Sequence, residues 1–138
     1  MKILIDTNVI IDVYQNRKDF VDNSAKVLKL SENRKVTGYI TASTITDIYF
    51  ILSRHIKDRQ QLKSLVQKLL SSVTLADVMA KDVTDSFDLV IEDFEDALLA
   101  QCAKRLKIDY IVTRNTKDFV NSPISAITPD DFLEKFFR

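Results

Sequence analysis

The sequence predicts an α/β protein, a three-layer α/β/α sandwich with a central parallel sheet of four to five strands. Short apolar runs rich in branched residues alternate with longer segments in which apolar residues recur every three or four positions. This alternation is typical of parallel strands joined by helices that cover both faces of the sheet. A single glycine and two prolines leave little material for long loops, so the connections should be short.

Five runs are the expected strands. Each is short, apolar and rich in branched residues, as strands buried on both faces should be. The last of them, between Pro123 and Pro129, has the weakest pattern. The expected strands cover 3–5, 36–40, 73–75, 109–112 and 124–127.

Helical periodicity fills the segments between these runs. A helix-compatible segment follows Asp6 at once, and Pro129 suits the first position of the last helix. Ser43 or Thr44 is the expected N-cap of the strongly apolar helix that ends near Arg54. The helices are expected directly after Asp6, around 21–28, and over 43–54, 59–70, 81–89, 93–107 and 129–137.

Composition bounds the class of protein. A chain of 138 residues is expected to form one domain, residues 1–138, around one core. Cys102 and a single histidine exclude an internal disulfide and the usual zinc ligands, so any metal must be held by oxygen atoms. A net charge of zero gives no basic field for nucleic acid. No secretory signal or membrane span is evident, so we expect a cytoplasmic protein.

Two acids stand where ligands bind in such folds. Asp6 ends the first strand, and ligands of open α/β sheets bind at the carboxyl ends of strands. Asp47 lies inside an apolar helix, with Phe50 and Ile51 as its neighbours one turn on. A carboxylate beside a core is costly unless it is paired or binds a metal, so we favour a functional role over a favourable interaction with the helix dipole.

A second group of acids opens the helix expected over 93–107. Asp96 lies at the margin of a buried stripe, since Leu99 and Ala100 follow it at three and four residues. Asp93 is most simply an N-cap, with Asp96 three residues later as in a capping box. We therefore take Asp96 as the main candidate and Asp93 as a supporting residue, and Glu95 is not expected to take part.

Polar residues also follow the fourth expected strand, beginning at Thr113. Asn115 and Asp118 offer oxygen atoms to a metal or to a water molecule bound to it. Arg114 adjoins these positions and is suited to contact a substrate phosphate. The alternative is an ordinary polar turn that Phe119 anchors to the core.

Together these positions predict a metal site. Strand ends and helix starts point to one edge of the sheet, and carboxylates gathered there repel one another unless a cation neutralises them. Oxygen ligands alone favour Mg²⁺ or Mn²⁺. A site of this kind suits hydrolysis of a phosphodiester, because the metal polarises the phosphoryl oxygen and activates water.

Four segments of the sequence resemble the PIN domain family. They are Leu4–Ile10, Asp47, Asp93–Leu98 and Ile111–Phe119, and they occur in the family's order and spacing over nearly the whole chain. A chain of this size resembles the VapC-like toxins of type II toxin–antitoxin pairs. The resemblance implies a Mg²⁺- or Mn²⁺-dependent endoribonuclease, usually a homodimer, that a cognate antitoxin holds inactive.

The resemblance also implies roles for individual residues. Asp6 and Asp96 match metal-binding acids of the family, and Thr7 and Asn8 match residues that orient Asp6 or a bound water. The same two residues are equally explained as the cap of the first helix.

The chain departs from the family pattern at two positions. Asp47 stands where many members have the longer Glu, and Asn115 stands where the acid of a Thr-x-Asp motif is often found. Either Asp118 replaces that acid, or a second ion binds weakly. The predicted catalytic and metal-binding set is Asp6, Asp47, Asp96 and Asp118, supported by Thr7, Asn8, Asp93, Thr113 and Asn115, with Arg114 on the substrate.

Other readings of the sequence remain open. A haloacid-dehalogenase-like phosphatase needs a second Asp where this chain has Asn8, and a response-regulator receiver needs a phosphoacceptor, for which only Asp77 is available. A different class is a PIN fold that binds RNA or a protein without catalysis, which Asn115 supports. Dependence of cleavage on a divalent metal separates that class from a nuclease.

Overall fold

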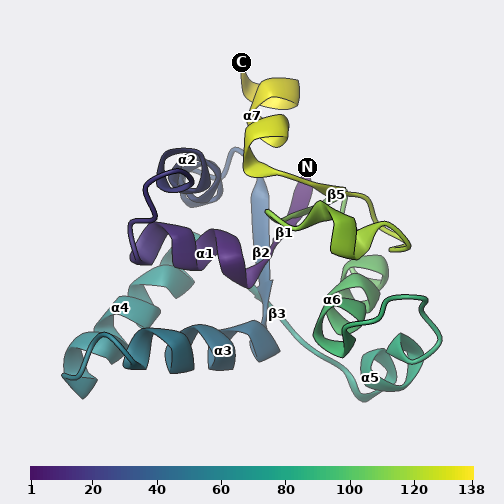
Figure 1. Ribbon diagram of the computed structural model, residues 1–138, viewed down its shortest axis with the longest axis horizontal. Coiled ribbons are helices and arrows are strands. Elements are labelled where there is room, and N and C mark those ends of the chain that lie inside the picture. The colour runs from purple at the N-terminus through teal and green to yellow at the C-terminus, as the bar shows by residue number, and fades with distance from the viewer.

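The computed structural model describes all 138 residues, which form a five-stranded parallel sheet between layers of helices (Figure 1). The α/β/α sandwich expected from the sequence is therefore confirmed. The strands are β1 (Lys2–Ile5), β2 (Thr37–Thr41), β3 (Thr74–Ala76), β4 (Tyr110–Val112) and β5 (Ala126–Ile127). The helices are α1 (Thr7–Tyr14), α2 (Val21–Glu32), α3 (Ala42–Ser53), α4 (Arg59–Ser72), α5 (Ala80–Ser86), α6 (Phe94–Arg105) and α7 (Pro129–Phe137), with a 3₁₀ turn, η1 (Thr116–Phe119).

The order of the strands places β1 at the centre of the sheet. The order is β3-β2-β1-β4-β5, all strands are parallel, and Leu4 of β1 is in register with Tyr39 of β2 and Ile111 of β4. The chain fills one side of β1 with β2 and β3 and then returns to the other side with β4 and β5. The carboxyl ends of β1 and β4 therefore form a topological switch point, where open α/β sheets bind ligands.

The two faces of the sheet have separate apolar cores. Ile3 and Ile5 of β1 are fully buried in the larger core, to which α1, α2, α3, α4 and α7 contribute. Leu4 and Ile111 are fully buried in the smaller core, against α6. Successive side chains of a strand point to opposite faces, so burial on both sides explains the continuous apolar runs of the sequence.

Most boundaries lie within one or two residues of the sequence-based expectation, but the starts of α3 and of β5 and the end of α5 differ in ways that matter. The N-cap of α3 is Thr41, whose Oγ1 accepts a hydrogen bond from the backbone N–H of Thr44 at 3.3 Å, so the prediction of Ser43 or Thr44 was wrong. The reason is that β2 continues through Thr41 and passes directly into the helix. The helix expected over 81–89 is α5, which ends at Ser86.

The position of β3 removes one alternative reading. This strand lies at the edge of the sheet, two strands away from β1. Asp77, which follows β3, is therefore not beside the carboxyl end of β1, as a phosphoacceptor of the receiver type would have to be. None of the helices is both long enough and apolar enough to cross a membrane.

Candidate active site

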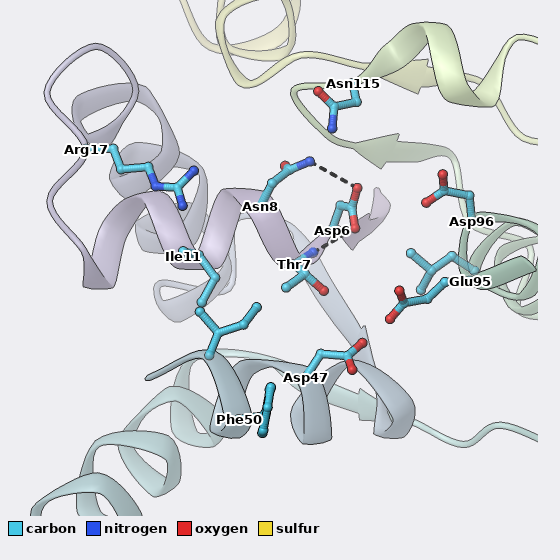
Figure 2. Close-up of a pocket in the computed structure, with 12 residues that line it drawn as sticks. Asp6, Thr7, Asn8, Ile11, Arg17, Asp47, Phe50, Glu95, Asp96 and Asn115 are labelled. Atoms are coloured by element: carbon cyan, nitrogen blue, oxygen red, sulfur yellow. Dashed lines mark hydrogen bonds between the residues drawn. The ribbon is translucent and has the colours of Figure 1, made fainter. Parts of the chain in front are cut away.

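A pocket of about 430 Å³ opens where β1 ends and α1 begins (Figure 2). It is acidic on one side, where side chains from the end of β1 and from α3 and α6 face one another. Its lining residues are Asp6, Thr7, Asn8, Ile11, Arg17, Asp47, Phe50, Ile51, Glu95, Asp96, Leu99 and Asn115. The structure therefore brings together six of the residues singled out in the sequence: Asp6, Thr7, Asn8, Asp47, Asp96 and Asn115.

Asp6 is held at the centre of this edge by hydrogen bonds to both of its carboxylate oxygens. The backbone N–H of Thr7 donates to Oδ1 at 2.8 Å, which makes Asp6 the N-cap of α1. The hydroxyl of Thr113 donates to Oδ2 at 2.8 Å, and Nδ2 of Asn8 donates to the same oxygen at 3.3 Å. These contacts orient the carboxylate and leave it 8% exposed toward the pocket.

The side chains around Asp6 tie the ends of β1 and β4 together. Nδ2 of Asn8 also donates to Oγ1 of Thr113 at 3.2 Å, and Oδ1 of Asn8 accepts from the backbone N–H of Arg114 at 3.2 Å. The backbone N–H of Asn115 donates to Oγ1 of Thr113 at 3.1 Å. Asn8 and Thr113 therefore position Asp6, and they also fix the loop after β4 that carries Asn115.

Burial raises the pKa of Asp6 above its ordinary value. The hydrogen bonds from Thr113 and from the N–H of Thr7 oppose this shift, because they stabilise the ionised form. The negative charge of Asp118 adds to the rise, and the positive charge of Arg114 acts against it. A buried carboxylate near other acids is costly in its charged form, and a nearby cation would lower that cost.

Asp47 of α3 and Glu95 of α6 face each other across the pocket (Figure 2). A hydrogen bond with Asp47, followed by burial and by the charges of Asp47, Asp93 and Asp6, raises the pKa of Glu95 to about 7. Glu95 therefore keeps its proton up to about pH 7. Glu95, which was not expected to take part, lines the pocket beside the predicted acids.

Asp96 projects from the first turn of α6 toward Asp6. Burial and then the charges of Asp93, Asp6 and Asp118 raise the pKa of Asp96 to about 7. The positive end of a helix dipole favours a carboxylate at this position. Because the pKa of Asp96 is raised, burial and repulsion must outweigh the effect of the helix dipole. Acids with shifted pKa values often occur at functional sites.

Two predicted residues lie in an adjoining groove rather than in the pocket itself. Asp93 and Asp118 line a groove of about 880 Å³ that meets the pocket at Asp96, and Lys117 lies there too. Oδ1 of Asp93 accepts from the backbone N–H of Asp96 at 3.0 Å, so the expected N-cap of α6 is confirmed. Asn115 lines the pocket directly, whereas Asp118 acts on Asp6 and Asp96 through its charge.

Arg114 points away from the pocket and into a buried ion pair. Its Nε donates to Oδ2 of Asp12 at 2.7 Å, and Asp12 is fully buried. Its guanidinium carbon also lies 4.2 Å from the centre of the Phe20 ring, at the distance of a cation–π contact. These contacts give Arg114 a structural role, and its contact with a substrate phosphate stays a prediction.

Replacing Arg114 by alanine should lower the free energy of unfolding by about 3 kcal/mol, because it removes the hydrogen-bonded partner of the buried Asp12 and leaves only the longer contact with Arg17 at 3.8 Å. Chemical denaturation measures this loss. The double variant Arg114→Ala/Asp12→Asn should regain part of it, since no unpaired charge remains. Arg59→Ala, at an exposed arginine without an ion pair, is the matched control. A loss below about 0.5 kcal/mol for Arg114→Ala would contradict the structural role.

The donor set of the pocket fits a hard divalent cation. Its titratable lining groups are carboxyl groups apart from Arg17, and Asn115 adds an amide oxygen. Mg²⁺ and Mn²⁺ prefer oxygen ligands of this kind. No group of three acidic, histidine or cysteine side chains is close enough together to enclose an ion.

Sequence reasoning missed Glu95 and Arg17. Glu95 was not expected to take part, but it lies in the first turn of α6 next to Asp96 and lines the pocket. Its place beside Asp96 was the signal that the sequence offered. Arg17 lies in the turn after α1, and no sequence pattern marked it.

The comparisons with known proteins agree with this geometry. The family model for the PIN domain matches residues 2–117. The chain therefore belongs to the PIN domain family, as the four sequence segments had indicated.

Within the family, the chain is similar to VapC proteins. Ribonuclease VapC1 of Aquifex aeolicus is 23% identical over 140 residues, which cover 98% of this chain and 95% of that protein. Among solved structures, VapBC2 from Rickettsia felis bound to a DNA fragment from its promoter has a TM-score of 0.73 at 21% identity, over 93% of this chain and 98% of that one. DNA-bound VapBC from Salmonella typhimurium has a TM-score of 0.72 at 16% identity, over 94% and 98%. The expected likeness to VapC-like members of the family is confirmed.

Proposed function

We propose that this protein is a divalent-metal-dependent endoribonuclease that hydrolyses RNA phosphodiesters, and that it is the toxin of a toxin–antitoxin pair. The observation that carries the proposal is the gathering of Asp6, Asp47, Glu95 and Asp96 in one pocket at the switch point of the sheet. Similarity to Ribonuclease VapC1 over nearly the full length of both chains supports RNA as the substrate.

In this proposal Asp6, Asp47 and Asp96 hold Mg²⁺ or Mn²⁺. Asp118 or Asn115 completes the ligand set, and Glu95 compensates for the short side chain of Asp47. The bound cation supplies Lewis-acid activation of the phosphodiester and of water. Thr113, Asn8 and the N–H of Thr7 keep the carboxylate of Asp6 in one orientation, through the three hydrogen bonds described above.

The products follow from the identity of the nucleophile. Water attacks the phosphorus in line, the bond to the 3′ oxygen breaks, and the ends left are a 3′-hydroxyl and a 5′-phosphate. The 2′-hydroxyl takes no part in this step. A cyclic 2′,3′-phosphate among the products would therefore exclude this mechanism.

The test is cleavage of structured RNAs by the purified protein in Mn²⁺, in Mg²⁺ and in EDTA, with mapping of the product ends. The proposal expects cleavage with either metal and none in EDTA. Equal cleavage by wild type and by Asp96→Asn would reveal a contaminating nuclease. If neither cleaves and calorimetry detects no metal binding, the protein is a non-catalytic PIN fold, the alternative that Asn115 supports.

The proposal of an antitoxin and of a homodimer rests on the similarity to VapC proteins. Solved VapBC complexes share this fold, which supports a cognate antitoxin as partner. A homodimer is the assembly that the resemblance to VapC-like toxins implies. Light scattering of the purified chain, alone and with the co-expressed product of a neighbouring gene, tests both. A monomer that binds no such product would contradict them.

A further inference from the structure

Arg17 is the cation that the acidic pocket contains, and its backbone is firmly held. It lies in the turn between α1 and α2, after Asn16, whose φ of 50° is left-handed. The N–H of Arg17 donates to the carbonyl of Asp12 at 3.0 Å, and its own carbonyl accepts from the N–H of Phe20 at 3.0 Å and of Val21 at 2.8 Å. The turn therefore fixes the position from which the side chain reaches the pocket.

The charge of Arg17 is only partly neutralised by Asp12, so Arg17 is available to bind an anion. The ion pair with Arg114 satisfies Oδ2 of Asp12, to which Ser24 Oγ also donates at 3.4 Å. Nη1 of Arg17 lies 3.8 Å from Oδ1 of Asp12, and this buried oxygen accepts no hydrogen bond. Two guanidinium groups thus share one carboxylate, which leaves an excess of one positive charge. The side chain of Arg17 is 44% exposed, compared with 21% for Arg114, so the excess charge faces the pocket.

The pocket is therefore polarised. Figure 2 shows Arg17 on one side of Asp6, while Glu95 and Asp96 lie on the other side and Asp47 lies below, on α3. The guanidinium makes one hydrogen bond, from Nη2 to Oε1 of Gln15 at 3.2 Å. An anion that entered the pocket would be repelled by the carboxylates and attracted to this end.

We propose that Arg17 forms a binding subsite for a phosphate group of the RNA backbone next to the phosphodiester that is cleaved. The inference rests on the proposed nuclease function. The planar guanidinium suits two parallel hydrogen bonds to phosphate oxygens. Asp12 positions it through charge, and Arg114 holds Asp12 in place through their ion pair.

The test measures binding without cleavage. Fluorescence anisotropy of a labelled single-stranded RNA octamer, in EDTA and at several salt concentrations, gives the affinity and its salt dependence. The background is Asp96→Asn, which removes one repelling charge from a side chain that accepts no hydrogen bond from its neighbours. Adding Arg17→Ala should weaken binding roughly tenfold and reduce the slope of log K against log salt by about 0.7, as expected for one lost phosphate contact on a single strand.

Three comparisons define the subsite. Arg17→Lys should keep the salt slope and regain part of the affinity, because it keeps the charge and loses the planar fork. The loss in Arg17→Ala should be equal for oligo(U) and oligo(A), since a phosphate contact carries no sequence information. Arg59→Ala, at an exposed arginine outside the pocket, should bind as the background does.

The outcomes separate this inference from the function on which it rests. Unchanged affinity and slope in Arg17→Ala, or an equal loss in Arg59→Ala, would overturn the subsite. A tenfold loss restricted to Arg17→Ala supports it, provided that thermal unfolding shows both variants folded. Absence of metal-dependent cleavage by the wild type would overturn the nuclease alone, because the anisotropy experiment involves no cleavage.

Discussion

Asp6→Asn is expected to lower the rate of RNA cleavage at least ~10³-fold, because Lewis-acid stabilisation worth several kcal/mol depends on this carboxylate. Asp6 is the candidate ligand at the switch point, between the ends of β1 and β4. Asparagine keeps the shape of the side chain but removes its negative charge. Single-turnover cleavage in Mn²⁺ measures the effect on the chemical step.

The same substitution should change the free energy of unfolding by no more than about 1 kcal/mol, because asparagine is as good an N-cap as aspartate. Its amide oxygen can still accept from the N–H of Thr7, and its amide nitrogen can donate to the hydroxyl of Thr113. The hydrogen bond from Asn8 is lost, but so is the cost of a buried charge. Urea denaturation tests this balance.

Asp22→Asn, at an exposed acid of α2, is the matched control and should leave both cleavage and stability unchanged. If Asp6→Asn unfolds at room temperature, the role of Asp6 is structural. Cleavage within tenfold of wild type by a folded Asp6→Asn protein would remove Asp6 from the chemistry altogether.

The residues that converge on Asp6 divide into those that the sequence could predict and those that it could not. Asp6, Asp47 and Asp96 could be found because each breaks a local rule, by ending an apolar strand or by standing beside a buried helix face. The parallel sheet then brings strand ends and helix starts to one edge. The positions of these acids in the fold can be predicted, because strands buried on both faces must be continuous apolar runs and their ends are therefore visible in the sequence.

The directions in which the side chains of Arg114 and Arg17 point could not be predicted from the sequence pattern. Both are arginines near the site, and Arg114 is closer in sequence to the predicted acids. The choice between them depends on Asp12, a fully buried acid of α1 that pairs with Arg114 through a long-range contact. Side-chain direction of this kind is decided by tertiary packing between α1, α2 and β4, and it is therefore invisible in a window of sequence.

In the absence of a divalent metal, the protein should lose stability as the pH rises from about 5 to about 7. The folded state holds protons on Asp96 and Glu95 up to a pKa of about 7, whereas their ordinary values are 3.8 and 4.5. The folded state thus binds more protons than the unfolded chain in this range, so stability falls with rising pH and levels off above pH 7. Thermal unfolding in EDTA between pH 5 and pH 8 measures the trend.

Asp6, whose pKa is also raised by burial, contributes to this trend with the same sign. The pKa of Asp82 is lowered, since its hydrogen bonds and ion pair with Arg105 outweigh the effect of burial. Its contribution is complete above its ordinary pKa of 3.8 and is lost only on acidification below that value. Asp96→Asn and Glu95→Gln should each flatten the slope between pH 5 and pH 7, while Asp22→Asn should leave it as in the wild type.

Adding Mn²⁺ should reverse the trend, because the cation takes the place of the protons that the acids would otherwise bind. At a metal concentration 100-fold above its Kd, the gain is about 2.7 kcal/mol, which corresponds to a rise in Tm on the order of 8 °C. The gain should be larger at pH 8 than at pH 5, and smaller in Asp96→Asn. A rise in Tm that is the same at both pH values, or the same in Asp96→Asn and in wild type, would mean that Mn²⁺ binds elsewhere. The raised pKa values and the proposed metal site are thus two consequences of one arrangement of carboxylates, and a single set of melting curves tests both.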